Sequence, residues 1–200
     1  MNTGEQTEDA DVECMRRLKG GDDLALNEIM ERWRQKIANY MMRCVGNEAD
    51  AVDLAQETFI RVYESRMRYE PRAAFSTWLF HIATNLARSH IRWHARHPVV
   101  PLGGVNGQDG EGEDAPDLSS SGLPASDASI KREQAAAVRD GIQRLGPDFR
   151  SILLLFEFEE LSYQQIAEIL GCSAKAVESR LYRARQALRE ELQKLKSHFL

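Results

Sequence analysis

The amino-acid sequence predicts an all-α protein with two small helical domains, a flexible acidic linker between them, and a helix-turn-helix in the second domain. Apolar residues recur every three or four positions through residues 22–96 and again after residue 129, which is the period of amphipathic helices. Nothing in the chain has the pattern of a strand. Residues 97–128, in contrast, are dominated by proline, glycine, serine and acidic residues. A chain of 200 residues is long enough for one or two domains with real cores.

The N-terminal residues 1–20 are expected to form a polar tail and a short helix. We expect the first ten or so to fray because they are polar. The short helix ends at the pair Gly20-Gly21, and its apolar side consists of Val12, Met15 and Leu18. The first domain then spans residues 21–96. It opens with a longer helix that Asp22 or Asp23 can cap and that ends at Gly46.

The next helix is predicted over residues 48–66, after Asn47 at its start. Its inner stripe is formed by Val52, Ala55, Phe59 and Val62. Its outer stripe is charged and consists of Asp50, Asp53, Glu57, Arg61 and Glu64. A solvated face explains such a stripe by default. Four acids with a single arginine among them also suit a basic partner surface.

A loop broken by Pro71 precedes a helix over Phe75–Arg96, with Ser76 or Thr77 near its start. Five residues share one side of this helix, at spacings of three and four: Trp78, His81, Asn85, Arg88 and Arg92. Aromatic rings that stack on bases, at roughly 1–3 kcal/mol each, and arginines that hold phosphates suit single-stranded nucleic acid. The alternative is a tryptophan in the core and arginines in solvent. This helix alone leaves both interpretations open.

Residues 97–128 are predicted to be a disordered acidic linker. No lysine or arginine occurs between His97 and Ile130, and such a composition cannot bury enough apolar surface to order itself. The second domain, residues 129–200, begins with a helix that ends at Gly146-Pro147. Another helix follows, from Asp148 or Phe149 through Phe158.

A helix-turn-helix is predicted from Leu161 to Arg185. Ser162 and Gln165 form a capping box, Gly171 suits the left-handed turn, and Ser173 can cap the second helix. Apolar residues line the inner side of the second helix, and its outer side carries Lys175, Glu178, Ser179, Arg180, Arg183 and Arg185. This arrangement favours a DNA-reading unit over an ordinary helical hairpin with a solvated basic face.

Composition places further limits on function. The net charge is −5, but arginines concentrate in two segments, so the charge does not exclude nucleic acid. The three cysteines are far apart and lack zinc-ligand spacing, which indicates reduced, buried thiols. His90 and His94 are one helical turn apart, but the sequence shows no obvious third ligand, so we expect no metal or other cofactor. With no signal peptide or long apolar run, we expect a soluble, cytoplasmic protein.

The chain resembles the extracytoplasmic-function (ECF) group of the bacterial sigma-70 family. Residues 50–59 are similar to that family's region 2.2, and residues 75–93, with the core Ser-Thr-Trp-Leu-Phe-His-Ile-Ala-Thr-Asn, to regions 2.3 and 2.4. Residues 145–155 are similar to region 4.1, and residues 163–189 to region 4.2. The resemblance covers both folded parts. It implies a non-enzymatic subunit that binds core RNA polymerase, reads promoter DNA and takes no small-molecule substrate.

The resemblance also implies a role for each face. Docking on the clamp helices of the largest polymerase subunit would use Asp50, Asp53, Gln56 and Glu57. The flap of the second-largest subunit would be a second contact. Recognition of the −10 element, in which a base flips into a protein pocket, would use Arg68, Tyr69, Arg72, Phe75, Trp78, His81, Asn85, Arg88 and Arg92. Recognition of the −35 element would use Lys175, Glu178, Ser179, Arg180, Tyr182, Arg183 and Arg185.

Two departures from the family limit what is carried over. Glu178 stands where relatives often have a basic residue, and Ala176 where they often have threonine, so the usual −35 sequence is not assumed. The group also implies an anti-sigma factor and a stress regulon. The alternatives are a sigma-like mimic that sequesters an anti-sigma factor and a helix-turn-helix regulator of another type. The arginines retained on both DNA faces argue against the mimic.

Overall fold

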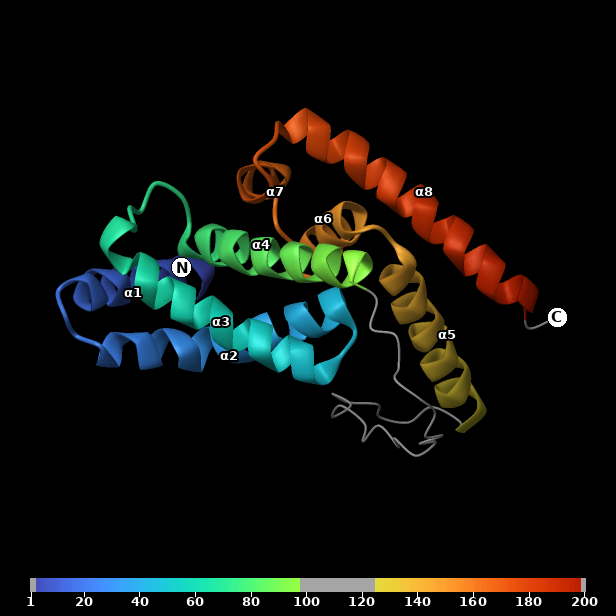
Figure 1. The fold of residues 1–200 in the computed structure, drawn as a ribbon, viewed down its shortest axis with the longest axis horizontal. Helices are drawn as coiled ribbons and strands as arrows, with labels where there is room; N and C mark the ends of the chain where they lie inside the picture. Colours follow the sequence, from blue (N-terminus) through green and yellow to red (C-terminus); the bar gives the residue numbers. More distant parts are fainter. Residues whose placement is uncertain (1–2, 98–124, 199–200) are drawn as a thin grey trace.

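The computed structural model describes residues 3–97 and 125–198, and within these ranges every element of regular structure is helical (Figure 1). The elements are α1 (Thr3–Lys19), α2 (Leu24–Val45), α3 (Glu48–Ser65), a 3₁₀ turn (Arg66–Arg68), α4 (Phe75–Arg96), α5 (Ala125–Arg144), α6 (Pro147–Glu157), α7 (Tyr163–Leu170) and α8 (Ala174–His198). The predicted all-α class with two helical domains is confirmed. No helix of these ranges is long and apolar enough to cross a membrane.

The N-terminal segment differs from the prediction, because α1 already begins at Thr3. Asp11, on this helix, is fully buried and accepts hydrogen bonds from the indole nitrogen of Trp33 and from Nε of Arg32, both at 2.8 Å. Burial raises the pKa of Asp11, while these two partners oppose the shift. Residues 3–10, which were expected to fray, are thus the first part of α1. The partners of Asp11 lie on α2, 21 and 22 residues away in the chain, and a local reading of polarity does not reveal them.

A second acid of α1 fixes the start of α4. The Glu8 carboxylate accepts hydrogen bonds from the backbone nitrogen of Phe75 at 2.7 Å and from the Ser76 hydroxyl at 2.5 Å. The N-cap residue Ala74 makes no side-chain bond. Ser76 and Thr77 lie in the first turn of α4, near its start as predicted. The anion that the positive end of the helix dipole favours comes from 67 residues earlier in the chain.

The inner stripe of α3 is rotated from the predicted one. Val52 is 45% exposed, whereas Ala51 and Thr58 are buried beside the expected Ala55, Phe59 and Val62. Thr58 can be buried because its hydroxyl donates to the Leu54 carbonyl at 2.8 Å. The assignment of Val52 to the core is therefore wrong. Ala51, a smaller residue, packs against the core of the domain in place of Val52.

Two helices of the second domain begin earlier than predicted. Helix α5 begins at Ala125, inside the stretch predicted as linker, and the remainder of that prediction, residues 98–124, lies outside the described residues. Helix α6 begins at Pro147, a favoured first helical residue, one position before the expected start.

The helix-turn-helix forms as its local signals predict. Ser162 and Gln165 make the capping box, and Gly171 adopts the left-handed conformation with φ of 62° at the end of α7. The Ser173 hydroxyl accepts from the backbone nitrogen of Ala176 at 3.2 Å at the start of α8. The core of the unit is formed by the buried side chains of Ile166, Ala167, Ile169, Val177, Leu181 and Ala184.

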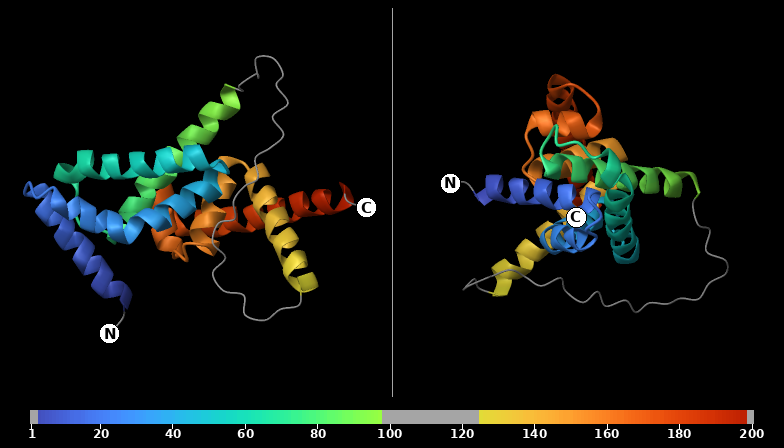
Figure 2. Two further views of the ribbon diagram at one scale, coloured as in Figure 1. Left: turned by 90° about the horizontal axis from the view of Figure 1, so that it is seen from below. Right: turned by 90° about the vertical axis from the view of Figure 1, so that its left-hand side faces the viewer.

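The two domains pack directly on one another. Helix α4 lies between the rest of the first domain and the pair α6 and α7, as two perpendicular views show (Figures 1 and 2). Buried Arg150 of α6 is one polar link between them, through its bond to Cys44 of α2. Its guanidinium donates to the backbone carbonyls of Cys44, Gln143 and Leu145, and to Oε1 of Gln143 at 2.8 Å. One side chain thus satisfies carbonyls at the C-terminal ends of α2 and α5.

A buried carboxylate follows at the end of α6. Both oxygens of Glu159 are at ion-pair distance from the first domain, at 3.7 Å from Arg43 and 3.8 Å from Lys36. Burial nevertheless raises its pKa, against the opposing effect of the two cations. The Arg43 guanidinium also lies 4.7 Å from the centre of the Phe158 ring.

Candidate nucleic-acid interface

The acidic stripe of α3 lies on one side of the first domain. Asp53 and Gln56 are exposed there, and half-buried Glu57 pairs with Arg61 at 2.8 Å, one turn later. Asp50 is half-buried because it faces α4. The structure therefore brings the four residues predicted to bind polymerase onto one helix, with Asp50 turned toward a neighbouring helix.

Two apolar residues of the same helix were missed by the sequence reasoning. Val52 is 45% and Ile60 is 51% exposed, and with Gln56 between them they follow one another at intervals of four residues. On a face that also carries acids, such exposed apolar side chains can supply apolar contact area to a partner protein. The signal in the sequence was the apolar pair at i and i+8 within a polar stripe.

The loop before α4 rests on a cluster of aromatic rings. Tyr69 and Trp78 have ring centres 4.8 Å apart, and Phe75 lies 5.9 Å from Trp78 and 6.0 Å from Trp33. Tyr69 is only 6% exposed and Phe75 is fully buried, so neither side chain is available to DNA from these positions. In this structure both rings have a packing role, Tyr69 against Phe75 and Trp78 of α4 and Phe75 also against Trp33 of α2, and their contact with DNA stays a prediction. Burial also raises the pKa of Tyr69 to about 12.

Other predicted −10 residues lie at the surface. Arg68, Arg72, His81, Asn85 and Arg92 are exposed, and Trp78 is half-buried. The His81 ring and the Asn85 amide are hydrogen-bonded at 3.2 Å. Helix α4 therefore presents a polar and aromatic side, as the spacing predicts.

Arg88 is the exception on this side of α4. Its side chain is 19% exposed, and its guanidinium donates to the Asp148 carboxylate at the start of α6. The side chain is thus held by the second domain in this structure. It lies in the junction between the two domains, where the sequence placed it on a free face.

The outer side of α8 carries the predicted −35 residues. Lys175, Glu178, Ser179, Tyr182 and Arg183 are exposed and Arg180 is half-buried. Among the described residues, Lys175, Arg180 and Arg183 form no ion pair. Five of the predicted residues help to line a shallow hollow of about 440 Å³: Lys175, Glu178, Ser179, Tyr182 and Arg185.

Arg185 has a structural use. Its guanidinium is 2.6 Å from Oε1 of Glu157 and lies 5.2 Å from the centre of the Phe156 ring. This contact ties α8 to α6. Tyr182 is 64% exposed, and its hydroxyl accepts from the Gln186 amide at 3.2 Å.

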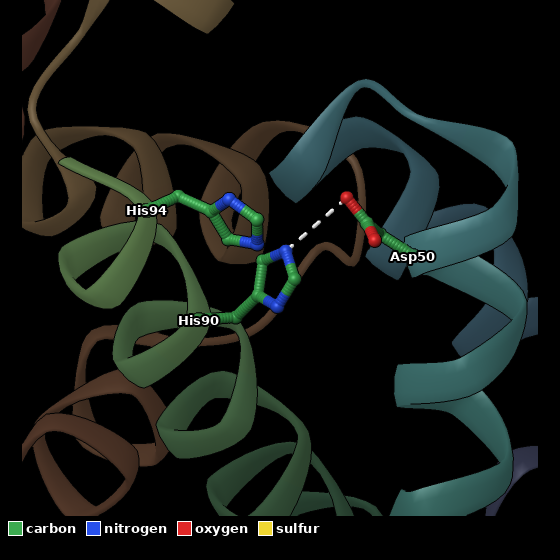
Figure 3. A group of neighbouring side chains, drawn as sticks. All are labelled: Asp50, His90 and His94. Atoms are coloured by element: carbon green, nitrogen blue, oxygen red, sulfur yellow. Dashed lines mark ion pairs between the residues drawn. The ribbon is translucent and has the colours of Figure 1, made fainter. Parts of the chain in front are cut away.

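The three cysteines, His90 and His94 lie outside the predicted DNA-binding residues. Cys14 and Cys44 are buried as expected, and burial raises the pKa of Cys44 to about 12, whereas Cys172 is only half-buried. His90 and His94 of α4 share a corner with Asp50 of α3 (Figure 3). Together they could hold a metal ion, with Asp50 as the ligand that the sequence did not reveal.

Comparison with known proteins identifies the family of this chain. Residues 29–97 match the family described as Sigma-70 region 2, and residues 135–188 match Sigma-70, region 4. The RNA polymerase sigma-H factor of Pseudomonas aeruginosa is 34% identical over 94% of this chain and 97% of its own length. The ECF RNA polymerase sigma factor SigW of Bacillus subtilis is 34% identical over 90% of this chain and 96% of its own.

The chain belongs to the ECF group of the sigma-70 family. It is a sigma factor, a non-enzymatic initiation factor that directs promoter recognition. This confirms the family, the fold class and the general function expected from the sequence.

Solved structures share the fold of this sigma factor. The structure of CnrH in complex with the cytosolic domain of CnrY has a TM-score of 0.64 and 23% identity, and the match covers 92% of this chain and 98% of that one. The sigma factor RpoE in complex with the anti-sigma factor NepR from Bartonella quintana has a TM-score of 0.60 and 22% identity, covering 84% and 96%.

Proposed function

We propose that this sigma factor grips RNA polymerase through α3 and reads the −10 and −35 elements through α4 and α8, in the cytoplasm where polymerase acts. The observation that carries the proposal is that Lys175, Arg180 and Arg183 on the outer side of α8 form no ion pair with any residue that the structure describes, while α3 of the other domain bears exposed acidic and apolar side chains. Two weakly binding domains on one tether gain affinity from their effective concentration when both elements are within reach.

The polymerase-docking face combines Asp53, Gln56 and Glu57 with the exposed Val52 and Ile60. Its acids suit the basic side of the clamp helices of the largest subunit, and its apolar pair supplies contact area that is removed from water on docking. The second domain would contact the flap of the second-largest subunit. Ile60→Ala is expected to weaken core binding without changing binding to isolated promoter DNA.

At the −10 element, the exposed side chains of α4 and the loop before it contact the non-template strand. The buried aromatic rings of Tyr69, Phe75 and Trp33 hold that loop in place from below. Arg88 reaches DNA only after its ion pair with Asp148 breaks. The contact between α4 and α6 at this ion pair must therefore open before α4 can make all of its −10 contacts.

At the −35 element, α8 enters the major groove with Lys175, Arg180 and Arg183 directed at bases and phosphates. Glu178 lies among these cations and can accept a hydrogen bond from a cytosine amino group. Arg185 contributes by holding α8 on α6, because its guanidinium is already bound to Glu157. We therefore assign base contact to Arg180 and Arg183 ahead of Arg185.

A cognate anti-sigma factor is also proposed. Two similar folds, CnrH and RpoE of Bartonella quintana, were solved in complexes whose partners are CnrY and the anti-sigma factor NepR. An inhibitor of this chain would cover the α3 and α8 faces. Affinity purification from resting and stressed cells should recover such a protein, and recovery of polymerase alone in both states would contradict this part.

Run-off transcription tests the proposal. Purified core polymerase with this chain should start transcription from one promoter class in a genomic library. A sigma-like mimic or a regulator of another type would give no specific initiation with any fragment, and that result would refute the proposal.

A pair of charge-matched variants locates the −35 contact. Arg183→Ala should weaken −35-dependent binding by about 1–3 kcal/mol if Arg183 contacts a base. Arg139→Ala removes another exposed arginine, on α5, and should leave the footprint unchanged. Equal effects of the two changes would remove Arg183 from the interface.

A further inference from the structure

Two histidines of α4 and one aspartate of α3 meet at the corner where α3 begins and α4 ends (Figure 3). Nε2 of His90 lies 3.3 Å from Oδ2 of Asp50. The rings of His90 and His94 have centres 4.2 Å apart. One ligand atom of each of the three side chains lies within 4.8 Å of the other two. Neither histidine takes part in the proposed contacts with polymerase or promoter DNA.

We infer that Asp50, His90 and His94 form a binding site for a divalent first-row transition-metal cation, with Zn²⁺ as the favoured ion. Imidazole nitrogen and carboxylate oxygen are its usual ligands, and three protein ligands leave a fourth tetrahedral position for water. Residues at i and i+4 share one helix face, which puts both imidazoles on the side of α4 that faces α3. The carboxylate then completes the set from the neighbouring helix.

The geometry requires only side-chain movement. Ligand atoms bound at about 2.0–2.1 Å around a tetrahedral Zn²⁺ are about 3.3 Å apart. The distance between His90 and Asp50 already has this value, and since the three ligand atoms lie within 4.8 Å of one another, no separation must shrink by more than about 1.5 Å. The side chains of His90 and Asp50 are 21% and 38% exposed, so they have room to rotate.

The backbone that carries these ligands is well held. Asp50 lies in the first turn of α3, where its backbone nitrogen donates to Oδ1 of the cap residue Asn47 at 3.0 Å. His90 lies inside α4 and His94 in its last turn. Ligands on fixed helices keep their positions better than ligands on loops. A bound cation would join α3 to α4 and would add positive charge beside the acidic docking face.

Calorimetric titration of the full-length, untagged and EDTA-treated chain with Zn²⁺ tests the site. We expect one equivalent to bind. Asp50→Asn, His90→Ala and His94→Ala should each lower the affinity by at least about tenfold, since even loss of an outer-shell partner often costs that much. Co²⁺ should quench the fluorescence of Trp93, whose ring centre is 4.8 Å from that of His94. Neither measurement uses polymerase or DNA, so its failure is separate from failure of the proposed function.

Two controls make the result specific. His97→Ala removes another histidine close to the end of α4, and Cys172→Ser removes the one cysteine that is not buried; both should retain the wild-type affinity. Thermal melting without metal shows whether each variant is folded, and His90→Gln replaces His90→Ala if the latter is not. The inference is overturned if the wild-type chain binds no stoichiometric Zn²⁺. It is equally overturned if Asp50→Asn binds as tightly as wild type, or if His97→Ala loses as much affinity as His94→Ala.

Discussion

Replacement of Arg150 by alanine should uncouple the two domains. Arg150 is 6% exposed, and its guanidinium donates to three backbone carbonyls and one amide oxygen across the junction of α2, α5 and α6. A hydrogen bond from a charged donor contributes about 1.5–3 kcal/mol. Removal of the guanidinium leaves neutral oxygens at the junction without a donor, and a buried oxygen left unpaired costs about 1–3 kcal/mol. The four bonds share one side chain and do not add, so we expect the change to lower the free energy of unfolding by about 2–4 kcal/mol.

Urea denaturation with two probes can measure this effect. All three tryptophans, at positions 33, 78 and 93, lie in the first domain, so their fluorescence reports that domain alone. Far-UV circular dichroism reports the helices of both. In the wild-type chain the two transitions should coincide. In Arg150→Ala the dichroism should begin to fall at lower urea than the fluorescence, because the second domain unfolds first.

The control and the refuting result are equally specific. Arg139→Ala removes an exposed arginine of the same domain and should change the free energy of unfolding by less than about 0.5 kcal/mol. If Arg150→Ala is as mild as this control and its two transitions still coincide, the guanidinium is not what joins the domains. The backbone carbonyls at the ends of α2 and α5 would then be satisfied by water in its absence.

Three further changes test the roles of single side chains. Burial raises the pKa of Glu159 above its ordinary value of 4.5, so the stability it contributes is complete below about pH 4.5 and is lost as the pH rises through the raised value. Glu159→Gln should therefore be more stable than wild type at pH 7, with the difference vanishing near pH 4 in urea titrations. A less stable variant at pH 7 would show that the ion pairs to Lys36 and Arg43 outweigh burial. Glu8→Ala removes the carboxylate at the start of α4 and should cost about 0.5–2 kcal/mol by thermal melting, with faster proteolysis of the loop over residues 69–74; unchanged proteolysis would contradict the capping role. Ser162→Ala breaks the capping box of α7 and should cost about 0.5–2 kcal/mol and weaken −35 binding, whereas an unchanged melt would mean that tertiary contacts alone hold this helix.

Local signals were read correctly where the interaction itself was local. The capping box of Ser162 and Gln165, the left-handed Gly171 and the cap by Ser173 each involve residues within a few positions of one another. The helical period likewise placed α4 over the predicted residues. Errors arose where packing selected among neighbouring possibilities. Val52 was assigned to the core and is exposed, because small Ala51 faces the inside of the domain in its place.

Among the candidate interface residues, too, the sequence predicted the exposure of some but not the distant partners of others. Exposure of Lys175 and Arg183 follows from their position on an amphipathic helix, so sequence was sufficient. The burial of Phe75 and Tyr69 depends on rings that come from α2 and α4. The engagement of Arg88 by Asp148 joins residues 60 positions apart. No periodicity within one helix can predict such a pair.

By itself, the sequence determined the helices, their caps, the helix-turn-helix and the family, because these depend on residue type at short spacing. Only the tertiary structure decided which distant groups meet. It placed Glu8 at the start of α4, Arg150 against the ends of α2 and α5, and Asp50 beside the two histidines of α4. The physical reason is that a buried or ligating polar group takes its partner from whichever element packing brings within about 3 Å, whatever its distance along the chain.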